Sequence, residues 1–268
     1  MADRLQVLLT NDDGIDALGL ERVHDALSDV AEVTVVAPET DRSGSWRLRS
    51  YAFEVDDREF GYAVDGTPCD CVNFGIGGLE TEFDLVVSGC NDGPNFGAHI
   101  VELSGTVGAA RQAAFLGVPG VALSLYSHPE GDHEFDPSDY AVVEEFVRGF
   151  VPDLAAADDP GVDYLNVNVP DELTAEVPVH LTELTYHCDI SVTEDGGRYK
   201  RRDPFYDPLR PDRDRELTGD VGMDRQAVGE GAISVTPLHV RARHGDHGRV
   251  GELLDGYETL HPERTADT

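Results

Sequence analysis

The stretch that decides the fold is residues 5–14, Leu-Gln-Val-Leu-Leu-Thr-Asn-Asp-Asp-Gly. Its apolar first half is typical of a buried strand, and the Asn, Asp and Gly residues that follow are typical of a turn. Because ligands bind where the strands of an open α/β sheet end, Asp12 and Asp13 lie at a candidate binding edge. Adjacent carboxylates repel each other unless a cation or a proton lies between them, which indicates a hard-metal site or an acid with a perturbed pKa. Taken alone, the segment fits an ordinary loop equally well.

Strand-like and helix-like segments alternate along the chain up to about residue 170. Further strands are expected at 33–37, 83–88, 119–125 and 164–169, and helices at 18–27, 69–74, 107–116 and 140–150, with a mixed, strand-like segment at 51–64. This alternation predicts an α/β fold with a mostly parallel, doubly wound sheet.

The amino-acid composition changes in the last third of the chain. Residues 187–224 are polar and rich in Arg, Asp, Gly and Pro, which favours an extended hairpin or arm, and residues 232–240 return to strand character. We therefore expect a Rossmann-like catalytic core at 1–185, an extended polar arm for oligomerisation at 186–230, and a returning strand with a C-terminal segment at 231–268.

The charge balance is extreme. The chain has 268 residues with 53 Asp and Glu against 20 Lys and Arg, a formal net charge of −33, and Lys200 is its single lysine. Molar salt screens such self-repulsion, so the composition predicts adaptation to a very salty cytoplasm. An acidic tail or disorder is disfavoured because the acids are spread among apolar periodic segments. A surface of this sign also argues against nucleic acid as a partner.

Neither a membrane anchor nor a disulfide framework is expected. No apolar run is long enough to span a bilayer, and the N-terminus lacks the pattern of a signal peptide, so we expect a cytoplasmic protein without a membrane partner. The four cysteines are too few and too irregularly spaced for a disulfide framework or a zinc site. Reduced packing roles are expected for Cys69, Cys71, Cys90 and Cys188.

Two further polar segments follow predicted strands. Residues 89–97 are dense in turn residues and amide oxygens, and Ser104, Gly105 and Thr106 precede an alanine-rich helical stretch. A polar cluster just before a helix is suited to bind an anion, because the first amides of the helix are unpaired. The alternative is simple N-capping by Ser104 or Thr106.

Together these motifs resemble the SurE family of survival proteins with 5'/3'-nucleotidase activity. The resemblance rests on residues 8–14, 36–38, 41–44, 66–68, 87–95, 104–106, 165–170 and 234–239, in order and spacing. It implies a Rossmann-like core and metal-dependent hydrolysis of nucleoside 5'-monophosphates, with 3'-monophosphates as a further substrate class.

The same resemblance implies the residues of the site. Asp12 and Asp13 would be catalytic, and they would ligate one divalent cation per subunit together with Ser43 and Asn91. This all-oxygen set suits Mg²⁺, Mn²⁺ or Ca²⁺. The phosphate would be held by Asn95, Ser104, Gly105 and Thr106. A homodimer or homotetramer with exchanged C-terminal elements is also implied.

The sequence leaves the reaction mechanism and the roles of several residues open. An aspartyl-phosphate-forming phosphotransferase and a non-catalytic nucleotide-binding module are the alternatives to hydrolysis by metal-activated water. His239 is a candidate proton donor, although a structural role is the simpler interpretation, and Asp224 is a weaker acidic candidate. Base-facing residues are expected in 46–53 and 198–215, and Leu103 stands where family members carry His or Tyr.

Overall fold

The computed structural model describes residues 4–44, 48–127, 135–157, 161–171, 176–186, 190–202 and 222–241. Its centre is a nine-stranded sheet with the order β3-β4-β2-β1-β5-β6-β7-β11-β8. The strands are β1 (Gln6–Thr10), β2 (Glu32–Pro38), β3 (Val55–Asp57), β4 (Tyr62–Val64), β5 (Leu85–Asp92), β6 (Gly120–Tyr126), β7 (Tyr164–Pro170), β8 (Val179–Leu181) and β11 (Ile233–Leu238).

The sheet is doubly wound around β1. β1 pairs in parallel with β2 on one side and with β5 on the other, and β6 and β7 continue the parallel run. Antiparallel pairing occurs between β3 and β4 and between β7 and β11. The prediction of an α/β fold with a mostly parallel, doubly wound sheet is therefore confirmed, and the winding places a topological switch point between β1 and β5.

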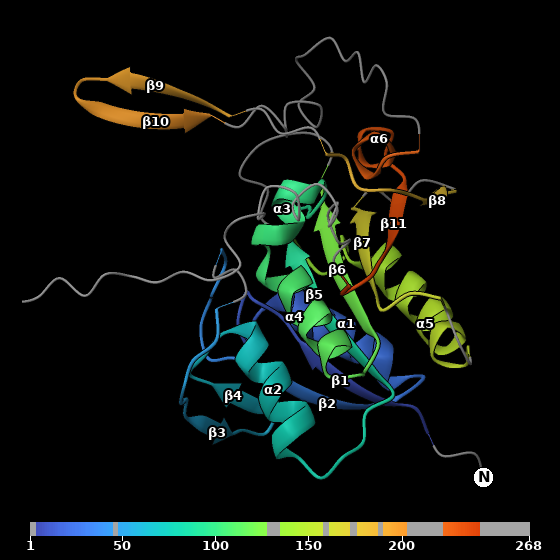
Figure 1. The fold of residues 1–268 in the computed structure, drawn as a ribbon. Coiled ribbons are helices and arrows are strands. Elements are labelled where there is room, and N and C mark those ends of the chain that lie inside the picture. The colour runs from blue at the N-terminus through green and yellow to red at the C-terminus, as the bar shows by residue number, and fades with distance from the viewer. Residues whose placement is uncertain are drawn as a thin grey trace, which may run out of the picture.

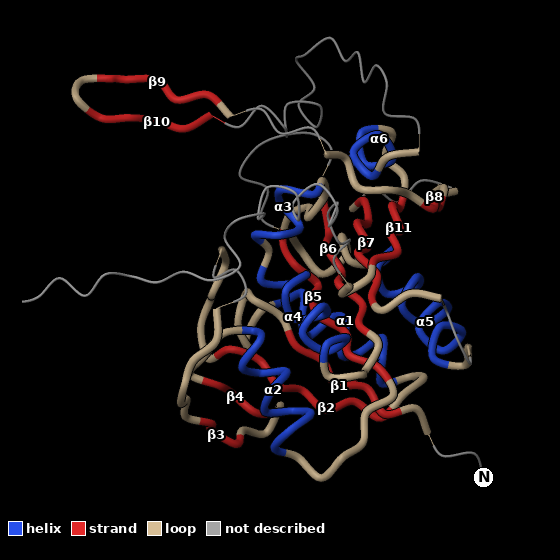
Figure 2. The backbone as a smooth tube through the Cα atoms, viewed as in Figure 1, coloured by secondary structure: helices blue, strands red, loops and turns tan. Residues whose placement is uncertain are grey.

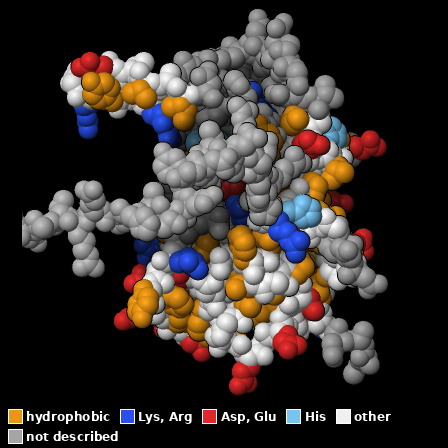
Figure 3. All heavy atoms as spheres, viewed as in Figure 1, with side chains coloured by type: hydrophobic (Ala, Val, Ile, Leu, Met, Phe, Trp, Pro, Cys, Tyr) orange, Lys and Arg blue, Asp and Glu red, His pale blue; other side chains and the backbone are white. Residues whose placement is uncertain are grey.

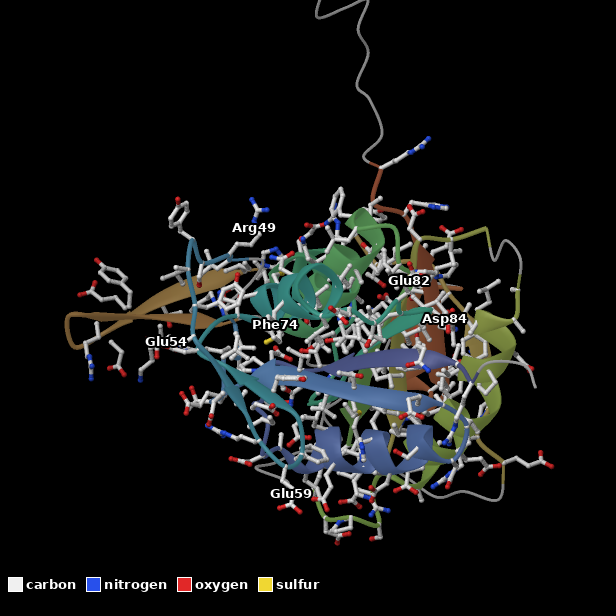
Figure 4. The ribbon with its side chains drawn as sticks, turned by 90° about the horizontal axis from the view of Figure 1, so that it is seen from below. Arg49, Glu54, Glu59, Phe74, Glu82 and Asp84 are labelled. Carbon is white, nitrogen blue, oxygen red and sulfur yellow. The ribbon has the colours of Figure 1, made fainter. Side chains whose placement is uncertain are left out.

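Helices cover both faces of the sheet (Figure 1). α1 (Leu18–Ser28) and α5 (Ala141–Ala155) pack on one face, and α2 (Pro68–Gly78) and α4 (Gly105–Phe115) pack on the other. Figure 4 shows the sheet between these layers, with Glu59 on the side of α1 and Phe74 on the side of α2.

β1 supplies core residues to both layers. Val7 and Leu9 belong to the core beneath α1 and α5, whereas Leu8 belongs to the core beneath α2 and α4. Successive side chains of a strand point to opposite faces, so a strand covered on both sides is apolar at every position. The continuous apolar run of β1 follows from this arrangement.

Two helix starts match local sequence features. Thr67 and Asp70 form a capping box at the start of α2, followed by Pro68, and α2 runs four residues beyond the end predicted for it. Ser104 caps α4 by accepting a hydrogen bond from the backbone N–H of Val107. The N-capping interpretation of Ser104 is therefore confirmed, and α4 begins two residues before the predicted start.

The segments outside the core contain elements that periodicity did not reveal. α3 (Ala98–Leu103) precedes α4, and α6 (Asp224–Gly229) packs against β11 and β7. In contrast, β9 (Ser191–Asp195) and β10 (Arg198–Arg202) match the extended hairpin expected within residues 187–224: they form a separate two-stranded antiparallel sheet that extends away from the nine-stranded sheet (Figure 2). Residues 187–189, 203–221 and 242–268, which the sequence analysis assigned to the arm and the C-terminal segment, lie outside the described residues.

Across the described ranges, no helix combines the length and the apolar character that a membrane crossing requires.

Candidate functional site at the switch point

The carboxyl ends of β1 and β5 bring the predicted polar loops together. Asp12 lies two residues beyond the end of β1, is only 3% exposed, and accepts a hydrogen bond of 2.5 Å from Thr106 Oγ1 at the start of α4. A Cβ atom at Gly105 would lie 2.8 Å from Asp12 Oδ2, so the close approach of α4 to this carboxylate requires glycine. The Asp12 carboxylate thus lies directly at the N-terminus of α4.

Asp13 is a strongly perturbed carboxyl group at this edge, and burial also raises the pKa of Asp12. Burial raises the pKa of Asp13 to about 8, and the nearby carboxylates of Asp12, Asp92 and Asp41 add to the increase. Its Oδ2 atom is buried and has no hydrogen-bond partner among the described residues. A buried carboxylate oxygen in this position is costly unless a proton or a cation occupies the space beside it.

The end of β5 adds an amide oxygen. Asn91 Nδ2 donates to the carbonyl oxygen of Gly93 at 2.6 Å, which holds the amide so that its Oδ1 atom is suited to ligate a cation. The neighbouring Asp92 accepts a hydrogen bond from Tyr140 Oη at 2.6 Å. Sequence reasoning did not identify Asp92 as part of this electrostatic cluster.

Ser43 lies on the loop after β2. The backbone N–H of Arg42 donates to the carbonyl oxygen of Asp12 at 2.7 Å, which holds this loop against the first one. Ser43 Oγ is exposed and donates to Asp41 Oδ1 at 2.6 Å, so its lone pairs are available to accept or ligate.

The residues present fit a hard divalent cation. The unpartnered Asp13 oxygen is the main observation, because a cation beside it would offset both its burial and the repulsion from its neighbours. Within the described ranges, no three His, Cys, Asp or Glu side chains converge in a metal-binding group, so a site here depends on Ser and Asn oxygens beside the two aspartates.

The predicted phosphate residues form a connected network. Asn95 Nδ2 donates to Ser124 Oγ at 3.0 Å and to Thr106 Oγ1 at 3.4 Å. Because Thr106 gives its only hydroxyl proton to Asp12, it can only accept from Asn95, which determines the orientation of the Asn95 amide. The structure therefore links Asn95, Thr106 and Asp12 directly.

Three residues hold the loop around Asn95, and of these the sequence offered only Asp224, as a weak acidic candidate. Asn166 and Asn168 of β7 bind its backbone, and Asp224 accepts a hydrogen bond of 2.6 Å from the N–H of Gly97. Two Asn residues at alternate positions of an otherwise apolar buried strand were a detectable pattern, since alternate positions face the same side of a sheet. Asp224 gave no comparable local indication.

Other candidates lie elsewhere. His239 Nδ1 is 3.3 Å from Asp163 Oδ2, and Asp163 precedes the amino end of β7, at the edge opposite the site, which favours the structural interpretation of His239 over a proton-donor role. Cys69, Cys71 and Cys90 are buried thiols, as expected, and Cys188 lies outside the described residues. Leu103 ends α3 directly before the Ser104 cap.

The fold and the site together define a class: a doubly wound α/β protein with an oxygen-lined site at its topological switch point. A sequence model of the family described as Survival protein SurE matches residues 7–189. The chain is 41% identical over 261 residues to 5'-nucleotidase SurE of Natronomonas pharaonis, covering 95% of this chain and 100% of that protein. It is 38% identical over 264 residues to 5'-nucleotidase SurE of Haloquadratum walsbyi, covering 96% and 98%.

The crystal structure of the SurE protein from Aquifex aeolicus superimposes with a TM-score of 0.74 at 28% identity, covering 95% of this chain and 100% of that chain. The chain belongs to the SurE family.

Proposed function

We propose that the protein is a metal-dependent 5'-nucleotidase that hydrolyses nucleoside 5'-monophosphates to nucleoside and phosphate, with 3'-monophosphates as a second substrate class. Relatives that align over nearly their whole length carry the name 5'-nucleotidase SurE. The observation that carries the proposal is the buried, unpartnered Asp13 oxygen beside Asp12, at the point where α4 begins.

Asp12, Asp13, Ser43 and Asn91 would hold the cation. When bound, a cation of this kind polarises phosphoryl oxygens and lowers the pKa of a water molecule at its open position. The protein's part is to keep Asp12 in place through Thr106 and the backbone of Arg42, and to present the amide oxygen of Asn91.

Asn95 and the first residues of α4 would hold the phosphate. Gly105 is the first residue of α4, so its N–H has no partner within the helix, and the helix dipole favours an anion beside it. Thr106 donates its hydroxyl proton to Asp12, so the N–H of Gly105 is the available donor at this terminus. Asn95 would donate to the phosphate in place of its long, 3.4 Å bond to Thr106, while its bond to Ser124 holds the amide in position.

Hydrolysis of a panel of substrates in molar KCl tests this function. We expect phosphate release from AMP or GMP to require added Mg²⁺ or Mn²⁺, to stop with EDTA, and to exceed release from short polyphosphate. Absence of any turnover would favour a nucleotide-binding module. An acid quench that traps labelled phosphate on the protein would favour the aspartyl-phosphate mechanism over attack by water.

We also propose that the protein is a homodimer or homotetramer held in part by the β9–β10 hairpin. A two-stranded hairpin is marginally stable by itself, and this one forms no pairing with the main sheet. Val192 and Tyr199 share one of its faces and are 61% and 75% exposed. Figure 3 shows apolar and basic side chains on this projection, and Lys200 and Arg201 are complementary to a chain of net charge −33.

Replacing Val192 and Tyr199 together by Asp should weaken this assembly. Removing two apolar anchors is expected to raise the dissociation constant at least about 100-fold. Light scattering coupled to size exclusion in 3 M KCl would show a smaller species at micromolar concentration. Thr193→Asp, on the opposite face of the same hairpin, is the matched control. A wild-type monomer, or an unchanged double variant, would contradict the proposal.

A further inference from the structure

The segment between Gly93 and Gly97 belongs to no helix or strand, so no regular backbone pairing positions it. Both glycines have positive φ, 120° and 77°, where glycine is favoured, and Pro94 restricts the backbone directly before Asn95. Asn95 nevertheless lies 93% buried between β6 and α4, with its side chain directed at Ser124 and Thr106. Contacts from outside the segment must therefore determine where Asn95 lies.

The contacts to Asn95 itself come from β7, while Asp224 and the buried cluster around Phe96 hold the residues that follow it. Asn168 Oδ1 accepts a hydrogen bond from the N–H of Asn95 at 2.7 Å. The carbonyl oxygen of Asn95 accepts from Asn166 Nδ2 at 2.6 Å and from Asn168 Nδ2 at 3.2 Å. Both polar groups of one peptide residue are thus held by two side chains that are completely buried.

Asparagine is well suited to this arrangement because one side chain offers a donor and an acceptor. An aspartate at 168 would accept from the Asn95 N–H but could not donate to its carbonyl oxygen, and an apolar side chain would leave both groups unpaired. Either change would remove hydrogen bonds to the Asn95 backbone, while the backbone pairing of β7 would be unaffected.

Asn166 shows that the arrangement is not simply a means of stabilising the sheet. Its Oδ1 atom is buried without a hydrogen-bond partner among the described residues, which is unfavourable for stability. The one side-chain hydrogen bond that Asn166 makes in the described structure goes to Asn95. An apolar residue would fill the same place without the unpaired oxygen.

We propose that Asn166 and Asn168 are positioning residues for phosphate recognition, which hold the Asn95 backbone so that its side-chain amide meets the substrate phosphate beside α4. The inference rests on the proposed nucleotidase function. It assigns no contact with the reacting atoms to either residue: both act through Asn95. Asn168 makes two of the three bonds and therefore carries the larger effect.

The test measures phosphate binding separately from turnover. Asn168→Ala and Asn166→Ala are compared with wild type by calorimetric titration with inorganic phosphate in the presence of Mg²⁺, and by KM and kcat for AMP. Asn168→Ala is expected to raise the phosphate Kd and the KM about tenfold, and Asn166→Ala about threefold. The Mg²⁺ concentration for half-maximal activation should stay within twofold, because the cation-binding residues are untouched.

Thr236→Val is the matched control. Thr236 is in register with Asn166 on the adjacent strand β11, is equally buried, and bonds to Thr182 instead of the Asn95 segment. It should lower the unfolding midpoint without changing the phosphate Kd or the KM.

An Asn168→Ala protein that melts earlier but keeps its phosphate Kd within twofold of wild type would overturn the inference. If Asn168→Ala does not fold, the phosphate Kd of Asn166→Ala is measured instead, and a value equal to that of wild type would overturn the inference. Wild-type protein that neither binds phosphate nor hydrolyses AMP would instead contradict the proposed function, so the two failures are distinguishable.

Discussion

Asp12→Asn is expected to reduce metal-dependent phosphate release from AMP by about 10² to 10³-fold, the range found when one charge-stabilising group is removed from an active site. The substitution deletes a ligand charge beside Asp13, while the Asn oxygen can still accept the hydrogen bond from Thr106. The loss should appear mainly in kcat and in the Mg²⁺ requirement, both measured by initial rates at saturating AMP.

The same variant should remain folded. Asp12 is buried, and its charge adds to the repulsion among carboxylates that raises the pKa of Asp13. Removing it should leave the unfolding midpoint of the metal-free protein unchanged or higher. Asp16→Asn is the control, because Asp16 is an exposed carboxylate four residues along the same loop. Full metal-dependent activity in Asp12→Asn would contradict the site assignment.

Salt should produce the largest change in stability. With a net charge of −33, self-repulsion falls as the Debye length decreases from about 10 Å at 0.1 M salt to about 3 Å at 1 M. A gain of about 4 kcal/mol in the free energy of unfolding would raise the midpoint by roughly 10 °C for a chain of this size. Thermal unfolding from 0.1 M to 3 M KCl measures this change.

Two features distinguish screening from a general effect of salt on apolar burial. Screening acts mostly below 1 M, so the steepest rise in midpoint should occur there, whereas strengthened burial continues to higher concentrations. Most of the described ion pairs, such as Arg58 with Glu39, are too exposed to add much stability, and the largely buried pair of Arg22 and Glu144 is less screened. The weakening of ion pairs by salt should therefore not cancel the gain. A flat midpoint across the whole range would contradict adaptation to high salt and would favour a basic protein partner for the acidic surface.

Sequence alone predicted those helices and strands that depend on neighbouring residues in the chain. β1, β5, β6 and β7 are buried on both faces, so each contains an apolar run that stands out from its surroundings, although Ser124 and the pair Asn166 and Asn168 interrupt β6 and β7. The start of α2 was visible because Pro68 is favoured in the first turn of a helix. The short helices α3 and α6 lack such features, and their six residues are too few to show a helical period.

The residues of the candidate site likewise fall into those that the sequence predicted and those whose role depends on distant partners. Asp12 and Asp13 were predicted because they follow an apolar strand at a turn, and residues in that place lie at the carboxyl edge of the sheet. Asn91, near the end of β5, was predicted by the family resemblance. Asp224 was only a weak candidate, because its importance comes from accepting hydrogen bonds from Gly97 and Thr185, residues 127 and 39 positions away. Nothing in its immediate sequence reflects those partners.

By itself, the sequence determined the order of strands and helices, the acidic character of the chain and the residues at the strand ends, since these depend on side-chain periodicity, turn chemistry and composition. Only the tertiary structure decided that β1 and β5 are neighbours at the switch point, that Thr106 bonds to Asp12, and that Asn166 and Asn168 hold the backbone of Asn95. The reason is physical: these are contacts between distant segments, made at distances set by the packing of the whole sheet and its helices.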